Sequence, residues 1–323
     1  MSDSHAQKTL SEPRQQTPWV RRALRHFKYK YIVRNGAQST PTLSPEKLHA
    51  QQLYKQRVTD FEAQLARLDI QGLEHFNWYH TIDLGEGLVT PGDFDYRALL
   101  PAFHFPKDMR GLNVLDVGSA TGFFAFEFER RGANVVSVEL PSLGQWDMCN
   151  PDRERILTDL TRFHRASSLQ EATYRHLHGP FQFCSERLGS KVRRCYATVY
   201  DLTPEKLGEA EFDLIFVGEV LLHLFSPLKA LDVLAPLCRG TLVIATMLFD
   251  ACDDKPYMQF LGDSLLEDDN RTWWSLTPRG LEAMLHGVGF QNVAVAGTCN
   301  VMHYRNLGSF GRQIIHAQKA PRV

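Results

Sequence analysis

From Asn113 to the C-terminus, short apolar runs alternate with amphipathic runs of helical period. The expected strands are 113–118, 134–140, 193–202, 212–224 (running into a turn), 240–248 and 292–299, and the expected helices are 122–132, 226–238 and 276–290. Apolar β-rich runs that alternate with helices indicate a parallel sheet covered on both faces. Residues 312–320 fit a closing antiparallel strand. We therefore predict an α/β fold.

Two segments depart from this alternation. Residues 140–195 are about twice as long as a simple strand–helix–strand connection requires, so an insert at 141–195 is predicted to hold extra helices. Near the N-terminus a linker precedes a predicted helix, with Ser44 as N-cap and Pro45 as its first residue. The predicted division is a basic arm with a helical extension at 1–73 and a catalytic domain at 74–323.

Composition limits the cellular compartment and the classes of binding partner that we expect. A net charge of −1 gives no global bias toward nucleic acid or membranes. Six cysteines without a C-x-x-C pair predict neither a metal site nor a disulfide framework, which fits a cytoplasmic protein. The polar N-terminus is unlike a signal peptide, and no apolar run is long enough to span a membrane. Residues 19–34 are basic with interleaved aromatics, so they could contact phosphates or form a solvated helix face.

The segment 113–140 places a small-residue turn between two carboxylates at expected strand ends. Gly118 and Gly122 would let the backbone approach a ligand, and Glu139 could accept both hydroxyls of a ribose. A dinucleotide site requires G-x-G-x-x-G, but Ala120 stands at the middle glycine. The charge of Asp116 would disfavour a pyrophosphate and favour a cationic ligand. An oxidoreductase or a non-catalytic nucleotide-binding domain is the alternative.

The run "VLDVGSATG" resembles the first motif of class I S-adenosylmethionine (SAM) methyltransferases, and "FDLIFVGEVLLHLFSPLKAL" resembles the fourth strand of that family. The resemblance implies a Rossmann-like sheet with helices on both faces and SAM as the cofactor. It implies that Asp116 lies near the methionine amino group, that the turn lies under the nucleoside, and that Glu139 holds the ribose. The implied cofactor-binding residues are Asp116, Gly118, Ser119, Gly122, Glu139, Tyr200, Asp201 and Glu219, with Tyr200 and Asp201 bordering the adenine.

Residues 74–318 are similar to the family of tRNA wobble-uridine carboxymethyltransferases, through "FNWYHTIDLGEGLVTPGDFDYRALLPAF", "LLHLFSPLKAL" and "LTPRGLEAMLHGVGF". The tRNA enzymes use carboxy-SAM, whose extra carboxylate is held by a lysine, a tyrosine and an arginine. Here Asn77–Tyr79 contains no lysine and Leu222 replaces the tyrosine, although Arg312 is retained. Because an unpaired buried carboxylate is costly, plain SAM and methyl transfer are predicted.

Candidate catalytic residues follow from the need to align an acceptor and remove its proton. His223, just after the fourth strand, is the candidate base, although it could be a packed histidine. His80 could be a base, a cofactor contact or structural. Glu219 could orient His223 or contact the amino-acid part of SAM. The predicted substrate contacts are Trp78, Tyr79, Trp273 and Trp274, although such large aromatics could equally be core.

The predicted acceptor is a hydroxyl of a small molecule or glycan, enclosed by the insert 141–195 and the Trp273 region. A tRNA or protein acceptor docked by the basic arm is one alternative, and a non-catalytic subunit with this fold is another. No membrane partner is predicted, and the oligomeric state is left open.

Overall fold

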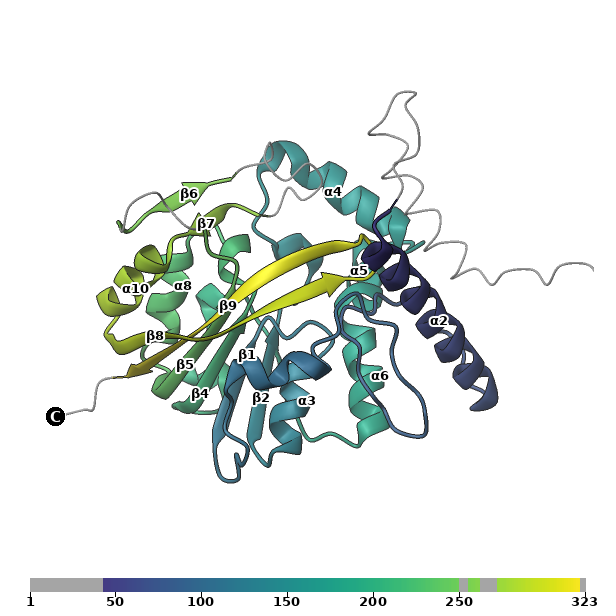
Figure 1. Ribbon diagram of the computed structural model, residues 1–323, viewed down its shortest axis with the longest axis horizontal. Helices are drawn as coiled ribbons and strands as arrows, with labels where there is room; N and C mark the ends of the chain where they lie inside the picture. The colour runs from purple at the N-terminus through teal and green to yellow at the C-terminus, as the bar shows by residue number, and fades with distance from the viewer. Residues whose placement is uncertain (1–42, 250–254, 262–271, 320–323) are drawn as a thin grey trace, which may run out of the picture.

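A computed structural model describes residues 43–249, 255–261 and 272–319, and its centre is a seven-stranded sheet (Figure 1). The strands lie in the order β3-β2-β1-β4-β5-β9-β8. Neighbouring strands from β3 to β5 are parallel, whereas β9 is antiparallel to both β5 and β8. The strands are β1 (Asn113–Val117), β2 (Asn134–Glu139), β3 (Arg193–Tyr196), β4 (Phe212–Gly218), β5 (Cys238–Thr246), β8 (Phe290–His303) and β9 (Gly308–Lys319). The predicted α/β sheet with a closing antiparallel strand is confirmed.

Successive side chains of the strands pack alternately into two hydrophobic cores, one on each face of the sheet. Val114 of β1 packs on the side of α3 (Phe123–Arg130) and α6 (Gly179–Leu188). Leu115 packs on the side of α7 (Pro204–Leu207), α8 (Pro227–Leu234) and α10 (Pro278–Gly287). Because successive strand residues point to opposite faces, the almost continuously apolar strands require this double cover.

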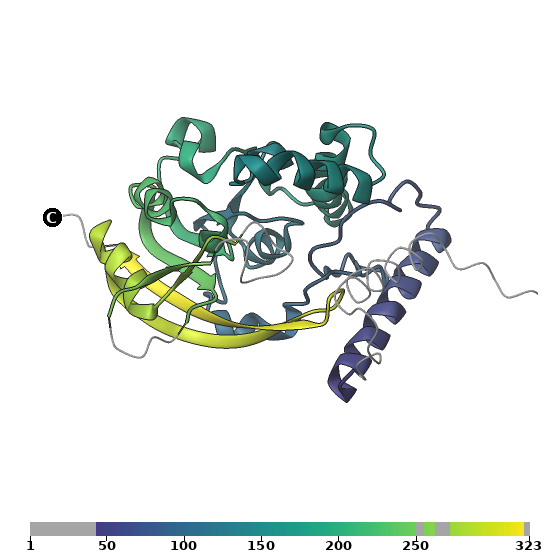
Figure 2. The same ribbon diagram turned by 90° about the horizontal axis from the view of Figure 1, so that it is seen from above.

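The long connection after β2 is helical, as predicted. It contains η2 (Leu143–Gln145), α4 (Asn150–Phe163), α5 (Leu169–Thr173), a π-helical turn (Tyr174–His178) and α6. Leu143, Ala172 and Leu177 form a small core of their own within it. Seen from above, the insert helices lie along one side of the molecule and the β8–β9 hairpin curves along the other (Figure 2).

The N-terminal helix α2 (Pro45–Arg67) begins as predicted, since the Ser44 hydroxyl accepts a hydrogen bond from the Lys47 amide at 3.4 Å. Its buried face packs on the domain, where the Phe61 and Trp78 rings lie 5.1 Å apart. Arg57 pairs with Asp95 at 2.7 Å. The helix is therefore attached to the residues that precede β1, and the domain boundary at residue 74 remains a prediction.

Three predicted boundaries are wrong. The strand expected at 193–202 ends at Tyr196, and Val199–Asp201 form the 3₁₀ turn η4. The apolar residues there are buried against the α8 side of the sheet without strand pairing. β5 begins at Cys238, which the sequence placed in a helix, because Pro236 follows the end of α8 and cannot continue it. β8 extends to His303 because it forms a long hairpin with β9.

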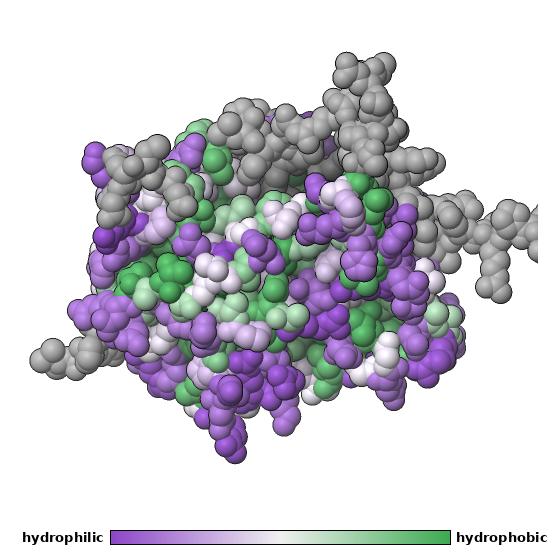
Figure 3. Space-filling model, in the orientation of Figure 1, coloured by the Kyte–Doolittle hydropathy of each residue, from purple (hydrophilic) through white to green (hydrophobic). Residues whose placement is uncertain are grey.

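Two short 3₁₀ turns and a small second sheet complete the fold. η1 (Arg97–Phe103) precedes β1, and η5 (Leu221–His223) follows β4. β6 (Met258–Phe260) and β7 (Trp274–Leu276) form a separate two-stranded antiparallel sheet. Hydrophobic side chains gather in the middle of the face shown in Figure 3, where the β8–β9 hairpin crosses it in Figure 1.

Candidate active site

The carboxyl ends of β1, β2 and β4 bring three predicted site residues to one edge of the sheet. Asp116 is the partner of Ser137 on β2 and of Phe216 on β4. Glu139 is the last residue of β2, and Glu219 follows the last residue of β4. Ligands of open parallel sheets bind outside these ends. The structure therefore places these three of the proposed cofactor-binding residues at one edge of the sheet.

The turn after β1 requires glycine at two positions. Gly118 has φ +72° and Gly122 has φ +93°. A Cβ atom at Gly118 would lie 2.5 Å from Cγ2 of Val220, and one at Gly122 would lie 2.7 Å from ring atoms of Phe126 and Phe181. Both positions therefore require glycine for two reasons, the left-handed backbone and the close packing of neighbouring side chains. The lack of a Cβ atom would also let a ligand approach the backbone of the turn.

Glu139 is held by the backbone of the turn. Its Oε2 accepts a hydrogen bond from the Ala120 amide at 2.8 Å, and its Oε1 accepts one from the Leu140 amide at 2.8 Å. The residue is only 7% exposed. Each carboxylate oxygen can accept a second hydrogen bond. The two amides therefore fix the orientation of the Glu139 carboxylate, and its oxygens can still accept hydrogen bonds from two hydroxyl groups.

Arg194 of β3 is a site residue that sequence reasoning missed. Its guanidinium donates to both Ser119 and Ser137 hydroxyls and, at 2.9 Å, to the Ala120 carbonyl. It lies 4.0 Å from the Glu139 carboxylate and 4.0 Å above the Phe181 ring. The run "RRCY" looks like an exposed edge strand, so its pattern gave no signal that one arginine supports the turn.

Asp116 is almost fully buried, at 1% exposure. Burial raises the pKa of its carboxyl group to about 7; Arg194 opposes the shift and Glu139 adds to it. Its Oδ2 has no hydrogen-bond partner among the described residues. A buried acceptor without a donor is unfavourable. A ligand that brings an N–H donor or a positive charge to this turn would satisfy it.

Glu219 forms a buried ion pair with Arg312 of β9, with 2.9 Å between Oε1 and Nε. The contact does not have the angle of a hydrogen bond. Burial raises the pKa of Glu219 to about 7, against the opposing effects of Arg312 and of the Met247 amide. Its backbone is left-handed, with φ +55°, which is uncommon outside glycine. His223 is half-buried in η5, the next turn of the chain.

His80 lies in an aromatic cage beside the glycine turn. Its ring centroid is 4.8 Å from that of Tyr79 and 5.9 Å from those of Tyr96 and Phe123. Its backbone amide donates to the Thr121 hydroxyl at 3.0 Å. Burial lowers the pKa of the imidazole to about 3, so the ring is neutral at neutral pH. It can accept a hydrogen bond there, but it is a weak base.

The predicted aromatic contacts fall into two groups. Trp78 is 1% exposed and packs in the core against Phe61, Phe76 and Phe183. Trp273 is also buried, at 4% exposure, but it lies beside the turn that follows β4, because its amide donates to the Leu222 carbonyl at 2.8 Å.

Two exposed aromatics that the sequence analysis did not single out accompany Trp273 and Trp274. The Phe225 ring lies 4.9 Å from that of Trp273, and the Phe260 ring lies 5.3 Å from that of Trp274. These two phenylalanines are 45% and 60% exposed. No periodic pattern marks them, because each lies in a short turn or edge strand. We call Phe225, Phe260, Trp273 and Trp274 the aromatic wall.

Tyr200 and Asp201 lie in η4, but they point differently. The Tyr200 hydroxyl donates to Asp147 of the insert at 2.7 Å. Asp201 is exposed, and its carboxylate accepts a hydrogen bond from the Thr198 hydroxyl at 2.6 Å. Their predicted contacts with adenine remain predictions.

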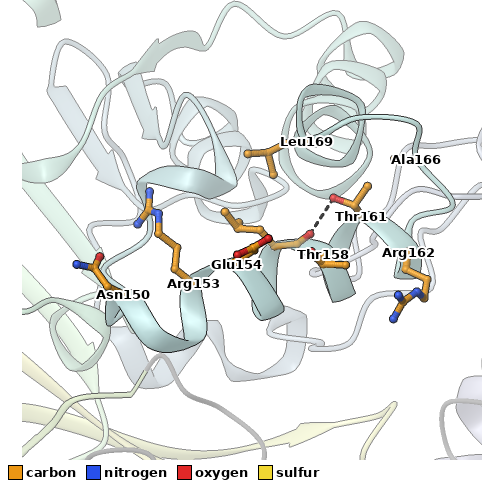
Figure 4. Close-up of a pocket in the computed structure, with 9 residues that line it drawn as sticks. Asn150, Arg153, Glu154, Thr158, Thr161, Arg162, Ala166 and Leu169 are labelled. Atoms are coloured by element: carbon orange, nitrogen blue, oxygen red, sulfur yellow. Dashed lines mark hydrogen bonds between the residues drawn. The ribbon is translucent and has the colours of Figure 1, made fainter.

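An open groove of about 650 Å³ lies on the insert, outside this set of strand ends. Figure 4 shows the labelled residues of α4 along the groove, from Asn150 at one end to Arg162 at the other. The Thr161 hydroxyl donates a hydrogen bond to the Leu157 carbonyl. None of its lining residues was predicted to bind cofactor. The groove therefore belongs to the surface of α4 rather than to the site at the sheet.

Three further properties bear on partners. Within the described residues, no three His, Cys, Asp or Glu side chains are placed to hold a metal ion. Among the described helices, none combines the length and the apolar character that a membrane crossing needs. The basic segment 19–34, proposed to contact phosphates, lies outside the described residues.

Comparisons with known proteins identify the family of the chain. A family model described as "Methyltransferase domain" matches residues 94–295. No curated protein sequence matches the chain.

The solved structures that match the chain include two methyltransferases and one domain crystallised with a cofactor product. Magnesium protoporphyrin IX methyltransferase from Synechocystis PCC 6803 with bound SAM is 14% identical over 65% of this chain and 71% of its own, with a TM-score of 0.39. The N-terminal domain of EvdMO1 with bound S-adenosylhomocysteine (SAH) is 14% identical over 88% and 100%, with a TM-score of 0.48. The 1,6-didemethyltoxoflavin-N1-methyltransferase of Burkholderia thailandensis is 16% identical over 88% and 94%, with a TM-score of 0.40. On the match over 94–295, which is more than half of its length, the chain belongs to the methyltransferase-domain family and is a SAM-dependent methyltransferase with a Rossmann-like α/β fold.

Proposed function

We propose that the enzyme transfers the methyl group of SAM to a hydroxyl of a small molecule or glycan, held between η5 and the aromatic wall. The observation that carries this proposal is the position of the wall. Trp273 is hydrogen-bonded to Leu222, which precedes His223, and the exposed Phe225 ring lies directly beside Trp273. Aromatic rings next to the end of β4 suit a compact acceptor with an apolar face.

The residues proposed to hold SAM fit a nucleoside with a cationic end. Among the described residues none donates to the buried Asp116 Oδ2, and an α-ammonium group would supply that donor. Each oxygen of the Glu139 carboxylate accepts one backbone hydrogen bond and can accept another, which we assign to the two ribose hydroxyls. Gly118, Ser119 and Gly122 form the turn between them, and Tyr200 with Asp201 is proposed to border the adenine.

SAM supplies a methyl group on a positively charged sulfur, so transfer is an in-line displacement. We assign to His223 the removal of the acceptor proton, because it lies in the turn at the end of β4. His80, neutral and caged, is assigned to positioning beside the turn. Glu219 is paired with Arg312, and we assign this ion pair to the support of the backbone at the end of β4.

Methyl rather than carboxymethyl transfer is supported by the same pair. Arg312, the retained one of three residues that hold carboxy-SAM in the tRNA enzymes, already contacts the Glu219 carboxylate at 2.9 Å. Trp78 and Leu222 are both buried, and neither side chain carries a charge that could pair with a second carboxylate. The relation to the tRNA wobble-uridine family stays part of this proposal and rests on sequence resemblance.

The decisive experiment combines ligand binding with product analysis. Calorimetric titration should show binding of SAM and SAH, with no heat from NAD. Transfer of labelled methyl to a cell extract should then place the label in a low-mass fraction. Label found only in tRNA would overturn the small-acceptor proposal and favour docking by residues 19–34. In that case the affinity of the protein for tRNA should fall about 10³-fold between 50 and 200 mM salt, if six or so basic residues contact phosphates.

A further inference from the structure

Asp147 joins loops that leave three different strands. It belongs to the connection after β2, eight residues beyond Glu139. Its Oδ2 accepts a hydrogen bond from the Tyr200 hydroxyl at 2.7 Å, in the loop after β3. The same oxygen accepts one from the Phe225 amide at 2.6 Å, in the loop after β4. One carboxylate oxygen therefore connects the loops at the carboxyl ends of β2, β3 and β4.

A second set of contacts extends this junction to the segment that enters β7. The backbone carbonyl of Asp147 accepts a hydrogen bond from the Trp273 indole at 2.9 Å. The Tyr200 hydroxyl accepts one from the Ser226 amide at 3.1 Å, and the Trp274 indole donates to the Phe225 carbonyl at 3.1 Å. The aromatic wall is thus tied to the same residue as Tyr200.

We infer that Asp147 is a positioning residue, which sets Tyr200 in place for the cofactor and the aromatic wall in place for the acceptor. This inference rests on the proposed function. Asp147 is half-buried and makes loop-to-loop contacts, whereas the loops it joins are otherwise anchored to separate strands. Ligands of such sheets bind among these loops, so fixing the loops relative to one another prepares the site before the ligand arrives.

The test compares Asp147→Ala and Asp147→Asn with the wild-type protein. Calorimetry measures the dissociation constant of SAH, steady-state kinetics measures kcat and KM for SAM, and thermal unfolding is followed without ligand. Asp147→Ala should raise the SAH dissociation constant and KM about 10- to 100-fold, since two charge-assisted hydrogen bonds are lost, and it should change kcat less. Asp147→Asn keeps an acceptor oxygen and should recover part of the loss.

A matched partner and a matched control sharpen the result. Tyr200→Phe should weaken SAH binding in the same direction, and the double variant Asp147→Ala/Tyr200→Phe should be weaker by less than the product of the two single effects. Asp159→Ala removes a carboxylate from the same insert, where it pairs with Arg162 at the surface, and should leave SAH binding unchanged.

The outcomes separate this inference from the proposed function. If the wild-type protein binds no SAH, the proposed function fails, and the inference fails with it. If the wild-type protein binds SAH and Asp147→Ala binds it equally well, only the inference is overturned. A lowered unfolding temperature with an unchanged dissociation constant for the folded protein would make Asp147 a structural residue, and would also overturn the inference.

Discussion

Arg312 of β9 and Glu219 at the end of β4 form a buried ion pair across the end of β5, with 2.9 Å between Nε and Oε1. The Glu219 amide donates to the Ala245 carbonyl of β5 at 2.8 Å, so the backbone around the pair is fixed as well. The antiparallel end of the sheet thereby contributes a charge to the site that the parallel strands build.

Replacing Arg312 by Met should be strongly destabilising. The substitution leaves the Glu219 carboxylate buried without its cation, which typically costs about 3–5 kcal/mol of unfolding free energy. Because the pKa of Glu219 is raised to about 7, the loss should be largest near pH 8 and smaller near pH 5.5, where the group is protonated. Urea unfolding at both pH values measures it.

The double variant Glu219→Gln/Arg312→Met is the control for charge. It removes both charges and should recover much of the stability at pH 8. An equal loss at pH 5.5 and pH 8 would assign the effect to packing of the arginine side chain instead.

The sequence predicted the part of the site that depends on local pattern. Asp116, the glycine turn and Glu139 lie within one strand–turn–helix–strand unit, and their spacing is visible in the chain. Arg194, Asp147 and the pair of Glu219 with Arg312 were not found, because their partners are distant in sequence. Asp147 lies 78 residues before Phe225, for example, and only the folded connections bring them to 2.6 Å.

Helix α2 and its cap were predictable for the same local reason, since Ser44 and Pro45 are adjacent. The extent of β8 was not, because a long hairpin is decided by pairing with β9 rather than by the residues of either strand. The strand expected to reach residue 202 failed because buried apolar residues can also occur in a 3₁₀ turn that packs on the sheet.

Gly118→Ala should lower the free energy of unfolding, and Gly111→Ala is its matched control. Both glycines have left-handed backbones, at φ +72° and φ +78°, so each substitution carries a strain of about 1–2 kcal/mol. Only the Cβ at Gly118 would meet a neighbour, Val220, and overpacking adds about 1–3 kcal/mol. Urea unfolding should show the difference, and Gly118→Ala/Val220→Ala should reduce it. Equal losses at the two glycines would contradict the packing at Val220.

Glu139→Ala should weaken SAH binding by about 1.5–3 kcal/mol, which corresponds to roughly 10- to 150-fold in the dissociation constant. The reason is the loss of the charge-assisted hydrogen bonds that we propose between Glu139 and the ribose. Calorimetry measures the change, with Glu46→Ala on the exposed surface of α2 as a control for removal of a carboxylate. An unchanged dissociation constant would remove Glu139 from the proposed cofactor site.

His223→Ala should lower kcat by about 10²- to 10⁴-fold if the imidazole removes the acceptor proton. SAH affinity should be little changed, because no cofactor contact is assigned to this side chain. The pH–rate profile supplies a second measurement, since the acidic limb that reports the base should disappear in the variant. A near-normal rate would leave alignment of the acceptor as the catalytic contribution of the site.

Binding of SAH should release protons from Asp116 near pH 6.5. With a pKa raised to about 7 by burial, the carboxyl group is mostly protonated at that pH in the ligand-free protein. The α-amino group of the ligand is protonated there as well. A cation beside Asp116 favours the ionised carboxylate, so the pKa should fall and the proton should leave.

The direction of the pH dependence follows from this shift. SAH affinity should rise from pH 6 to about pH 7.5 and then level off, because above the pKa no proton has to be removed. Without ligand, the raised pKa means that the native state binds more protons than the unfolded state between about pH 4 and pH 7, so this group makes stability fall as pH rises through that window. Calorimetry in two buffers of different ionisation enthalpy counts the protons released. Asp116→Asn should bind SAH more weakly, and its binding enthalpy should no longer depend on the buffer. An unchanged buffer dependence in that variant would assign the released proton to another group. Glu219 would be the first to test, because its pKa is also raised to about 7.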